Sequence, residues 1–188
     1  MQEIESRLKQ AVDFLRDKGV RYADARFVDT LTESILVKDQ AVENFVRATD
    51  RGVGVRALFR GAWGFASTAD LSEASVMKTA EEALITARAS ALANTEKVKF
   101  APEEPREAEW RGPCERDPFQ VSTDDKLSLL FKATAAMMRH PKIKTAEGSM
   151  DFTRRERIFV STEGASLRQT KTSSGAGIAA TAIENGEF

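Results

Sequence analysis

The stretch Arg51-Gly-Val-Gly-Val-Arg-Ala-Leu-Phe-Arg-Gly-Ala-Trp-Gly-Phe-Ala-Ser67 decides the fold of this chain. From Val53 to Phe59, apolar residues alternate with glycine or polar residues, and a second short run follows Arg60-Gly61. Alternation with a period of two on both sides of a turn-prone pair is typical of antiparallel β-strands. The stretch therefore predicts two strands joined by a tight turn.

Similar patterns surround this stretch. Short alternating runs continue over residues 22–68 and predict an antiparallel meander of about five strands. Residues 2–18 have apolar side chains at helical spacing, and Gly19 follows them, which indicates an amphipathic helix. A second helix is predicted to start at Asp70-Leu-Ser-Glu73, with Asp70 as its cap. Its apolar stripe is mostly alanine, which suits close contact with a flat sheet.

The second half of the chain begins with a linker over residues 94–121, which holds four of the five prolines. Because Phe100, Trp110 and Phe119 are too apolar for a free tether, we expect these rings to be docked on the surface. Ser122 is predicted to cap a third helix that ends at Pro141. Strand patterns follow, with turn signals at Arg154-Arg155, Glu163-Gly164 and Asn185-Gly186.

The two halves resemble each other. Ser34-Ile-Leu-Val-Lys38 is similar to Arg157-Ile-Phe-Val-Ser161, and Gly52-Val-Gly-Val55 is similar to Gly175-Ala-Gly-Ile178; residues 34 to 157 and 52 to 175 are both 123 positions apart. This offset predicts a duplication. We expect an α+β fold in which a unit of one helix and an antiparallel meander is repeated, with an incomplete second copy. The expected parts are a domain over 1–93, the linker over 94–121 and a truncated unit over 122–188. The chain would then be a fragment.

The composition excludes several classes of protein. A net charge of −1 gives no electrostatic support for binding to nucleic acid or to an anionic membrane. No apolar run approaches the roughly 20 residues that span a bilayer, and the charged N-terminus lacks the apolar core of a signal peptide. With a single cysteine, Cys114, no internal disulfide is possible. We therefore expect a cytoplasmic protein.

Catalytic chemistry is missing from the sequence. The single histidine, His140, follows a predicted helix, where a cation at the helix end is the simplest interpretation and metal binding the sharper one. One histidine and one cysteine do not supply a zinc site. Gly52-Val-Gly-Val-Arg-Ala57 matches a dinucleotide fingerprint, but that motif must open a helix and this segment is predicted to be a strand. We predict no catalytic, cofactor-binding or metal-binding residues.

Two further groups of residues have open interpretations. The carboxylates Asp24, Asp29, Glu33 and Glu43 are most simply the solvated face of the sheet. Trp63 and Phe65 are predicted to lie on one face of their strand, where they either pack in the core or contact a peptide or partner protein.

Five segments, in this order along the chain, carry a family resemblance. They are Tyr22-Ala-Asp-Ala-Arg26, Gly52-Val-Gly-Val-Arg-Ala-Leu58, Trp63-Gly-Phe-Ala-Ser-Thr68, Asp117-Pro-Phe-Gln-Val-Ser122 and Phe159-Val-Ser-Thr-Glu-Gly164. Together they resemble the N-terminal region of the TldD/PmbA family, whose members are also described as modulators of DNA gyrase. The resemblance runs over essentially the whole chain.

The resemblance implies a cytoplasmic zinc metallopeptidase that degrades or trims peptides and unfolded segments as a homodimer or a family heterodimer. In the TldD branch, a His-Glu-x-x-x-His zinc motif follows the region matched here, so zinc is expected in the full-length protein and not in these residues. We expect this part to scaffold a chamber, to dimerise and to guide peptide, without nucleic acid or membrane contacts. The alternative is a non-catalytic PmbA-type partner subunit or an interaction module.

Overall fold

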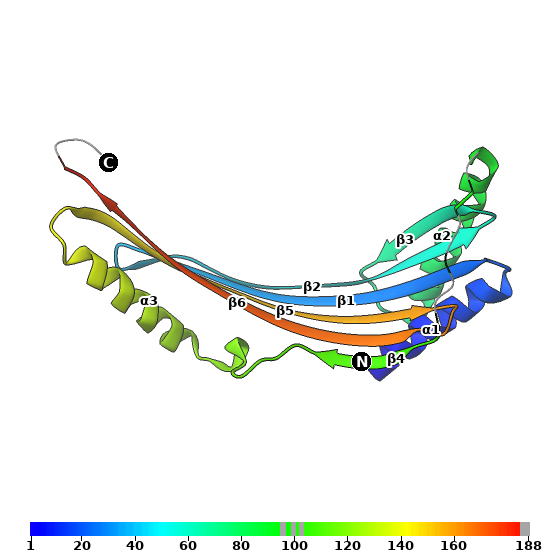
Figure 1. The fold of residues 1–188 in the computed structure, drawn as a ribbon, viewed down its shortest axis with the longest axis horizontal. Coiled ribbons are helices and arrows are strands. Elements are labelled where there is room, and N and C mark those ends of the chain that lie inside the picture. The colour runs from blue at the N-terminus through cyan, green and yellow to red at the C-terminus, as the bar shows by residue number, and fades with distance from the viewer. Residues whose placement is uncertain (95–96, 99–100, 102–103, 185–188) are drawn as a thin grey trace. The chain divides into compact units, whose positions relative to one another are not determined.

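The computed structural model describes residues 1–94, 97–98, 101 and 104–184. As predicted, these residues form an α+β fold, with three α-helices and one six-stranded sheet (Figure 1). The helices are α1 (Gln2–Asp17), α2 (Glu73–Ala93) and α3 (Thr123–Met138), with a 3₁₀ turn η1 (Pro118–Gln120) before α3. The strands are β1 (Tyr22–Lys38), β2 (Ala41–Phe59), β3 (Ala62–Thr68), β4 (Glu107–Arg111), β5 (Ile143–Ser161) and β6 (Ser166–Ala182).

The strand order in the sheet is β3-β2-β1-β5-β6-β4. β2 and β3 pair in antiparallel fashion, as the opening stretch of the sequence predicts, whereas the short β4 pairs parallel to β6. β1 and β5 are antiparallel neighbours, because the Thr162 amide donates to the Ala23 carbonyl near one end and the Asp39 amide donates to the Ala146 carbonyl near the other.

The chain divides into two compact units, each made of three separate stretches. Unit 1 comprises Met1–Asp29, Asp50–Arg111 and Arg155–Thr170, and unit 2 comprises Thr30–Thr49, Gly112–Arg154 and Lys171–Phe188. Four strands, β1, β2, β5 and β6, contribute residues to both units. The predicted division into residues 1–93, 94–121 and 122–188 stays a prediction.

The strands are fewer and longer than predicted. Residues 22–68 form three strands instead of five, and β1 and β2 are 17 and 19 residues long. Similarly, β5 runs through Arg154-Arg155, where a turn was predicted. Polar residues inside a strand resemble turn signals, but they continue the strand when neighbouring strands pair with their backbone. The predicted turn at Glu163-Gly164 is present, with a φ of 87° at Gly164, and the one at Asn185-Gly186 lies outside the described residues.

The helix ends follow capping chemistry, with one correction. Ser72, not Asp70, is the N-cap of α2, because its side chain accepts a hydrogen bond from the Ser75 amide at 3.3 Å. The Asp70 carboxylate supports this cap by accepting from the Ser72 amide and the Ser75 hydroxyl. Ser122 caps α3 as predicted, accepting from the Asp125 amide at 3.1 Å.

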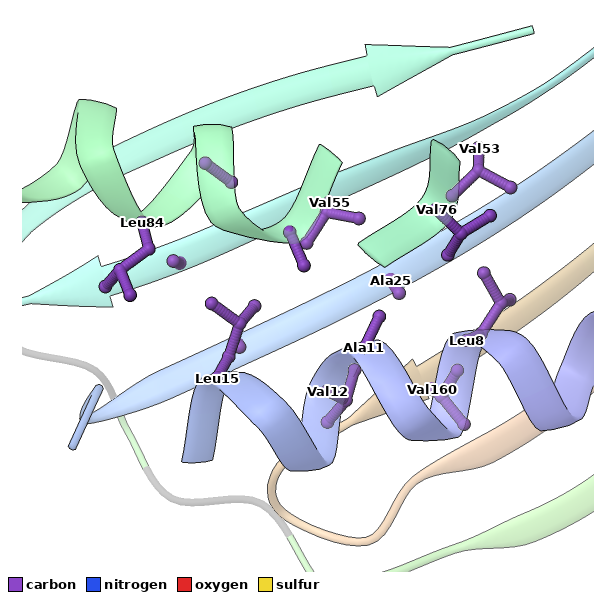
Figure 2. Packing of buried hydrophobic residues seen from close by; sticks show 14 of the residues in the cluster. Leu8, Ala11, Val12, Leu15, Ala25, Val53, Val55, Val76, Leu84 and Val160 are labelled. Carbon is purple, nitrogen blue, oxygen red and sulfur yellow. The ribbon is translucent and has the colours of Figure 1, made fainter. Parts of the chain in front are cut away.

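Unit 1 has its core between the sheet and the helices α1 and α2 (Figure 2). Leu8 and Leu15 of α1 are fully buried, as are Val55 of β2 and Val76 of α2. The alanine stripe of α2 lies against β3, as predicted, and Gly64 makes the contact closest. A methyl group on Gly64 would lie 2.0 Å from the Ala83 carbonyl oxygen, so only glycine fits at this position.

Unit 2 has a smaller core between α3 and the sheet, built from Ile35, Val37, Phe119, Leu130, Met150 and Phe152. It contains a buried ion pair, in which Lys126 of α3 donates to Glu33 of β1 at 2.5 Å. The Lys126 ammonium also lies 4.5 Å from the centroid of the Phe152 ring. Ion pair and ring together compensate for the loss of water around a charge that is almost wholly buried.

The linker prediction is correct only in part. Phe119 is docked in the core of unit 2, whereas Trp110 is 49% exposed and Phe100 lies outside the described residues. Trp110 belongs to β4, a strand that the proline-rich, charged sequence did not predict. Its backbone is held by pairing with β6, which does not require its side chain to be buried.

Candidate functional surface

The sheet of unit 1 has one face that neither α1 nor α2 covers, and we call it the open face. Alternate residues of β1 and β2, such as Ala25 and Val55, pack in the core beneath the helices. Their neighbours Asp24, Arg26 and Arg56 therefore lie on the opposite, open face, since successive side chains of a strand point to opposite sides.

Trp63 and Phe65 lie on the open face, opposite Gly64. The Phe65 side chain is 59% exposed, so the alternative that it packs in the core is wrong. Trp63 is half-buried and packs edge-on against Tyr22, with ring centroids 5.8 Å apart. The two residues share a face as predicted, and their contact with a peptide or partner stays a prediction.

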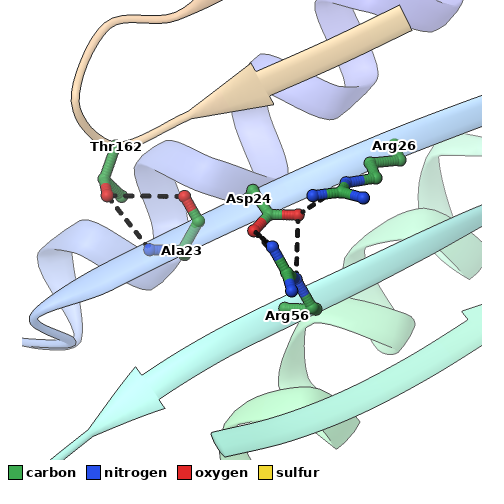
Figure 3. A network of polar contacts seen from close by, with 5 residues as sticks. All are labelled: Ala23, Asp24, Arg26, Arg56 and Thr162. Carbon is green, nitrogen blue, oxygen red and sulfur yellow. Dashed lines mark hydrogen bonds and ion pairs between the residues drawn. The ribbon is translucent and has the colours of Figure 1, made fainter. Parts of the chain in front are cut away.

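On the same face, a buried carboxylate holds two arginines (Figure 3). Asp24 is fully buried and accepts hydrogen bonds from Arg56 through Nε at 3.0 Å and Nη2 at 2.6 Å. Arg26 donates its Nε to the other carboxylate oxygen at 3.2 Å. The hydrogen bonds to Asp24 raise the pKa of Arg56, and burial, helped by the Asp24 charge, raises the pKa of Tyr22. This surface is thus cationic, and the Tyr22 phenol stays neutral.

Each arginine also stacks on an aromatic ring. The Arg56 guanidinium lies 5.0 Å from the centroid of the Trp63 ring, and that of Arg26 lies 5.0 Å from the centroid of the Phe159 ring in β5. A buried carboxylate and a ring fix each guanidinium at two points, which preorganises the hydrogen-bond donors that remain. Such an arrangement can bind an acidic group without first ordering the arginine side chains.

Two of the four carboxylates expected on a solvated face are buried. Asp24 is 0% and Glu33 is 2% exposed. Asp24 is satisfied by arginines from two strands, and Glu33 by Lys126, with Arg47 at 3.9 Å. Neither arrangement is visible in the sequence, because the main partners Arg56 and Lys126 are distant along the chain. The signal that could have suggested these buried ion pairs is that arginines and carboxylates both occur at alternate positions within apolar runs.

The segment that matches the dinucleotide fingerprint has the local structure predicted for it. Gly52 to Ala57 lies within β2 and opens no helix. Helix N-terminal amides, which bind phosphate in that motif, are therefore missing from this segment. The prediction that this segment forms a strand and not the start of a helix is confirmed.

Comparison with known proteins identifies the family. A model described as PmbA/TldA metallopeptidase domain 1 matches residues 23–87, and one described as PmbA/TldA metallopeptidase central domain matches residues 116–188. The two matches follow each other in order and together cover most of the chain. The chain belongs to the PmbA/TldD metallopeptidase family. No curated protein sequence matches the chain.

Solved structures of similar fold come from bacteria and an archaeon. A proposed modulator of DNA gyrase from Bacteroides thetaiotaomicron matches with a TM-score of 0.78 and 15% identity over 100% of this chain and 43% of its own. One from Thermotoga maritima matches with a TM-score of 0.71 and 17% identity, over 95% of this chain and 43% of its own. TldE from Thermococcus kodakarensis matches with a TM-score of 0.73 and 12% identity, over 96% of this chain and 40% of its own. The chain thus spans less than half the length of these proteins.

The residues described here do not fit the metal that the family name implies. Across residues 1–94, 97–98, 101 and 104–184, no three His, Cys, Asp or Glu side chains converge as metal ligands would. His140 follows α3, and its Nδ1 accepts a hydrogen bond from the Lys142 amide at 3.3 Å. Cys114 is exposed on the loop after β4. We therefore derive no metal-dependent step from these residues.

A cavity of about 620 Å³ lies in unit 2 beside α3. Its lining includes Leu129, Met150 and Phe152, and Lys126 reaches it from α3. Because Lys126 is already paired with Glu33, its charge is compensated.

In the described part of the chain, no helix is both long and apolar enough to cross a bilayer.

Proposed function

We propose that this chain is the peptide-handling, N-terminal part of a TldD-type zinc metallopeptidase that degrades or trims peptides and unfolded segments. The observation that carries the proposal is the ordered match of residues 23–87 and 116–188 to the first and central domains of a metallopeptidase family. Zinc and the catalytic residues would lie outside residues 1–188. This part would scaffold a chamber, take part in a homodimer or family heterodimer, and guide peptide.

The open face supports the role in guiding peptide. Phe65 is largely exposed beside Trp63, and large exposed aromatic side chains are enriched where proteins bind peptides and other proteins. Among the strands that the structure describes, β3 is the last on its side of the sheet, so its outer edge offers backbone groups to an extended chain. Neither feature needs catalytic residues in this part of the protein.

Binding of an unfolded polypeptide to residues 1–188 tests this role. Fluorescently labelled, unfolded casein peptides should bind the chain, and Phe65→Ala should weaken the binding several-fold. Ile85→Ala is the matched control, because Ile85 is 64% exposed on α2, away from the open face. Equal loss in both variants, or no binding by the unchanged chain, would contradict the role.

The sequence that follows residue 188 in the full-length protein separates the two branches of the family. A His-Glu-x-x-x-His motif with stoichiometric zinc would establish the peptidase. A complete protein without the motif would favour the alternative, a PmbA-type partner subunit or interaction module. The proposal includes a cytoplasmic location, supported by the single cysteine, Cys114, which is exposed and free. Light scattering of the purified protein tests the dimer.

The internal duplication also belongs to this proposal. The two pairs of similar sequence segments fall at equivalent places in two helix–hairpin repeats, α1-β1-β2 and α3-β5-β6. In both repeats, the first similar segment ends the leading strand, directly before the hairpin turn. This order supports an ancestral repeat of one helix and one hairpin.

A further inference from the structure

A cavity of about 490 Å³ opens beside the arginines of the open face. It lies over β1, β5 and β6, and its lining includes Arg26, Val28, Arg157, Phe159, Leu167 and Gln169. Its floor is apolar, since Phe159 and Leu167 belong to it, and its volume is within the range of ordinary ligand sites. The site is therefore large enough for one or two amino-acid side chains.

The charged residues that line this cavity are both positive. They are Arg26 and Arg157. Arg157 is exposed and makes no ion pair with any residue that the structure describes. The buried Asp24 carboxylate offsets only one of the two positive charges of Arg26 and Arg56, with which it is paired, so these residues and Arg157 together keep a net positive charge. A ligand that complements the cavity must bring negative charge.

Arg26 is held ready for such a ligand. Its Nε donates to Asp24, and its guanidinium carbon lies 5.0 Å from the centroid of the Phe159 ring. Its side chain is nevertheless 53% exposed, so the donors that Asp24 does not use face solvent. An arginine that is already ordered loses less conformational entropy on binding, which favours a carboxylate at this position.

We propose that this cavity binds an acidic side chain of an extended peptide, with the carboxylate between Arg26 and Arg157 and a neighbouring apolar residue on Phe159 and Leu167. The inference rests on the proposed function, because it names the class of peptide that the open face accepts. It predicts that the protein prefers segments in which an acidic and an apolar residue are two positions apart, since side chains at positions i and i+2 of an extended peptide point to the same side.

Four labelled peptides with blocked ends test the proposal by fluorescence anisotropy. Three repeat the sequence X-Ser-Phe-Ser with Glu, Gln or Lys at X, and we call them the Glu-Phe, Gln-Phe and Lys-Phe peptides; the fourth is Gln-Phe with a free C-terminal carboxylate. The Glu-Phe peptide should bind the 188-residue chain most tightly. Arg157→Gln should weaken its binding about five-fold, as expected for one partly exposed charged hydrogen bond, and added salt should have the same effect. Arg16→Gln on α1 is the matched control, because it removes one exposed positive charge outside the cavity.

The outcomes distinguish a failure of the acidic preference from a failure of the proposed function. If Glu-Phe and Gln-Phe bind equally and Arg157→Gln changes neither, the acidic preference is wrong, while a loss in Phe65→Ala would keep the proposed function. If no peptide binds, both fail. If the free C-terminus alone gives tight, Arg157-dependent binding, the ligand is a chain end and the proposal is overturned. Tighter, Arg157-dependent binding of a single-stranded oligonucleotide would overturn it as well.

Discussion

At the scale of single residues, the chain buries carboxylates and pairs each of them with cations from distant segments. Asp24, Glu33 and Glu5 are 0%, 2% and 8% exposed. Arg56 binds Asp24, Lys126 binds Glu33 and Arg168 binds Glu5. A buried charge that loses its partner is costly, so these pairs make the correct pairing of strands and helices energetically distinct from incorrect ones.

Glu5 gives a pH-dependent prediction. Burial alone would raise its pKa, but hydrogen bonds from Lys9, Arg168 and Ser166 outweigh burial and lower the pKa from 4.5 to about 2. Because the pKa is lower in the folded than in the unfolded state, ionised Glu5 stabilises the fold fully above pH 4.5 and loses this effect as the pH falls towards 2. Glu5→Gln should therefore cost about 2 kcal/mol at neutral pH, allowing for solvent screening.

Urea unfolding between neutral pH and about pH 3 measures this effect. The difference in unfolding free energy between Glu5→Gln and the unchanged chain should shrink steadily as the pH falls below 4.5, the pKa of the Glu5 carboxyl in the unfolded chain. Glu81→Gln is the control, because Glu81 is exposed on α2 and should change stability by less than about 0.5 kcal/mol. A cost of Glu5→Gln that is independent of pH would show that the ionised carboxylate is not what stabilises the fold.

At the scale of elements, the packing of α2 on β3 depends on small residues on both sides. Ala80, Ala83 and Ala87 of α2 are fully buried. On β3, Gly64 removes the last side chain between helix and strand, so the two backbones come into direct contact. The alanine stripe predicted a flat partner, but the sequence does not tell which glycine meets it, because Gly52, Gly54, Gly61 and Gly64 all lie in one alternating stretch.

Gly64→Ala should destabilise the protein by about 3 kcal/mol or more. The new methyl carbon would lie 2.0 Å from the Ala83 carbonyl oxygen and 2.3 Å from the Ala87 amide nitrogen, so α2 as a whole must shift. Thermal and urea unfolding measure the cost. Gly177→Ala is the matched change in β6, where the added carbon would meet only the Ser149 hydroxyl, at 3.6 Å. Equal stability of the two variants would mean that α2 does not rest directly on β3.

At the scale of the whole molecule, local pattern predicts elements better than it predicts their limits and partners. The three helices and the pairing of β2 with β3 follow from periodicity over neighbouring residues. The lengths of β1, β2 and β5 do not, because pairing across the sheet carries a strand through polar residues such as Asp50. The open face was half predicted: Trp63 and Phe65 are close in sequence, whereas the arginines and Phe159 join them only in the folded sheet.

The continuous strands lead to a prediction about cooperativity. β1, β2, β5 and β6 each pass from one unit to the other without a break, so their backbone hydrogen bonds link the stability of the two cores. We expect one unfolding transition. Ile35 of unit 2 and Ile158 of unit 1 are both fully buried, and replacing either with valine should cost about 1 kcal/mol.

Both tryptophans, Trp63 and Trp110, belong to unit 1, so their fluorescence reports on that unit. Ile35→Val lies in unit 2, yet it should lower the urea midpoint of the fluorescence transition as much as Ile158→Val does, and circular dichroism should give the same midpoints. If Ile35→Val leaves the fluorescence midpoint unchanged while the circular dichroism transition splits, the two units unfold independently. In that case, the shared strands would be covalent connections that transmit no stability, and the folding unit would be each core separately.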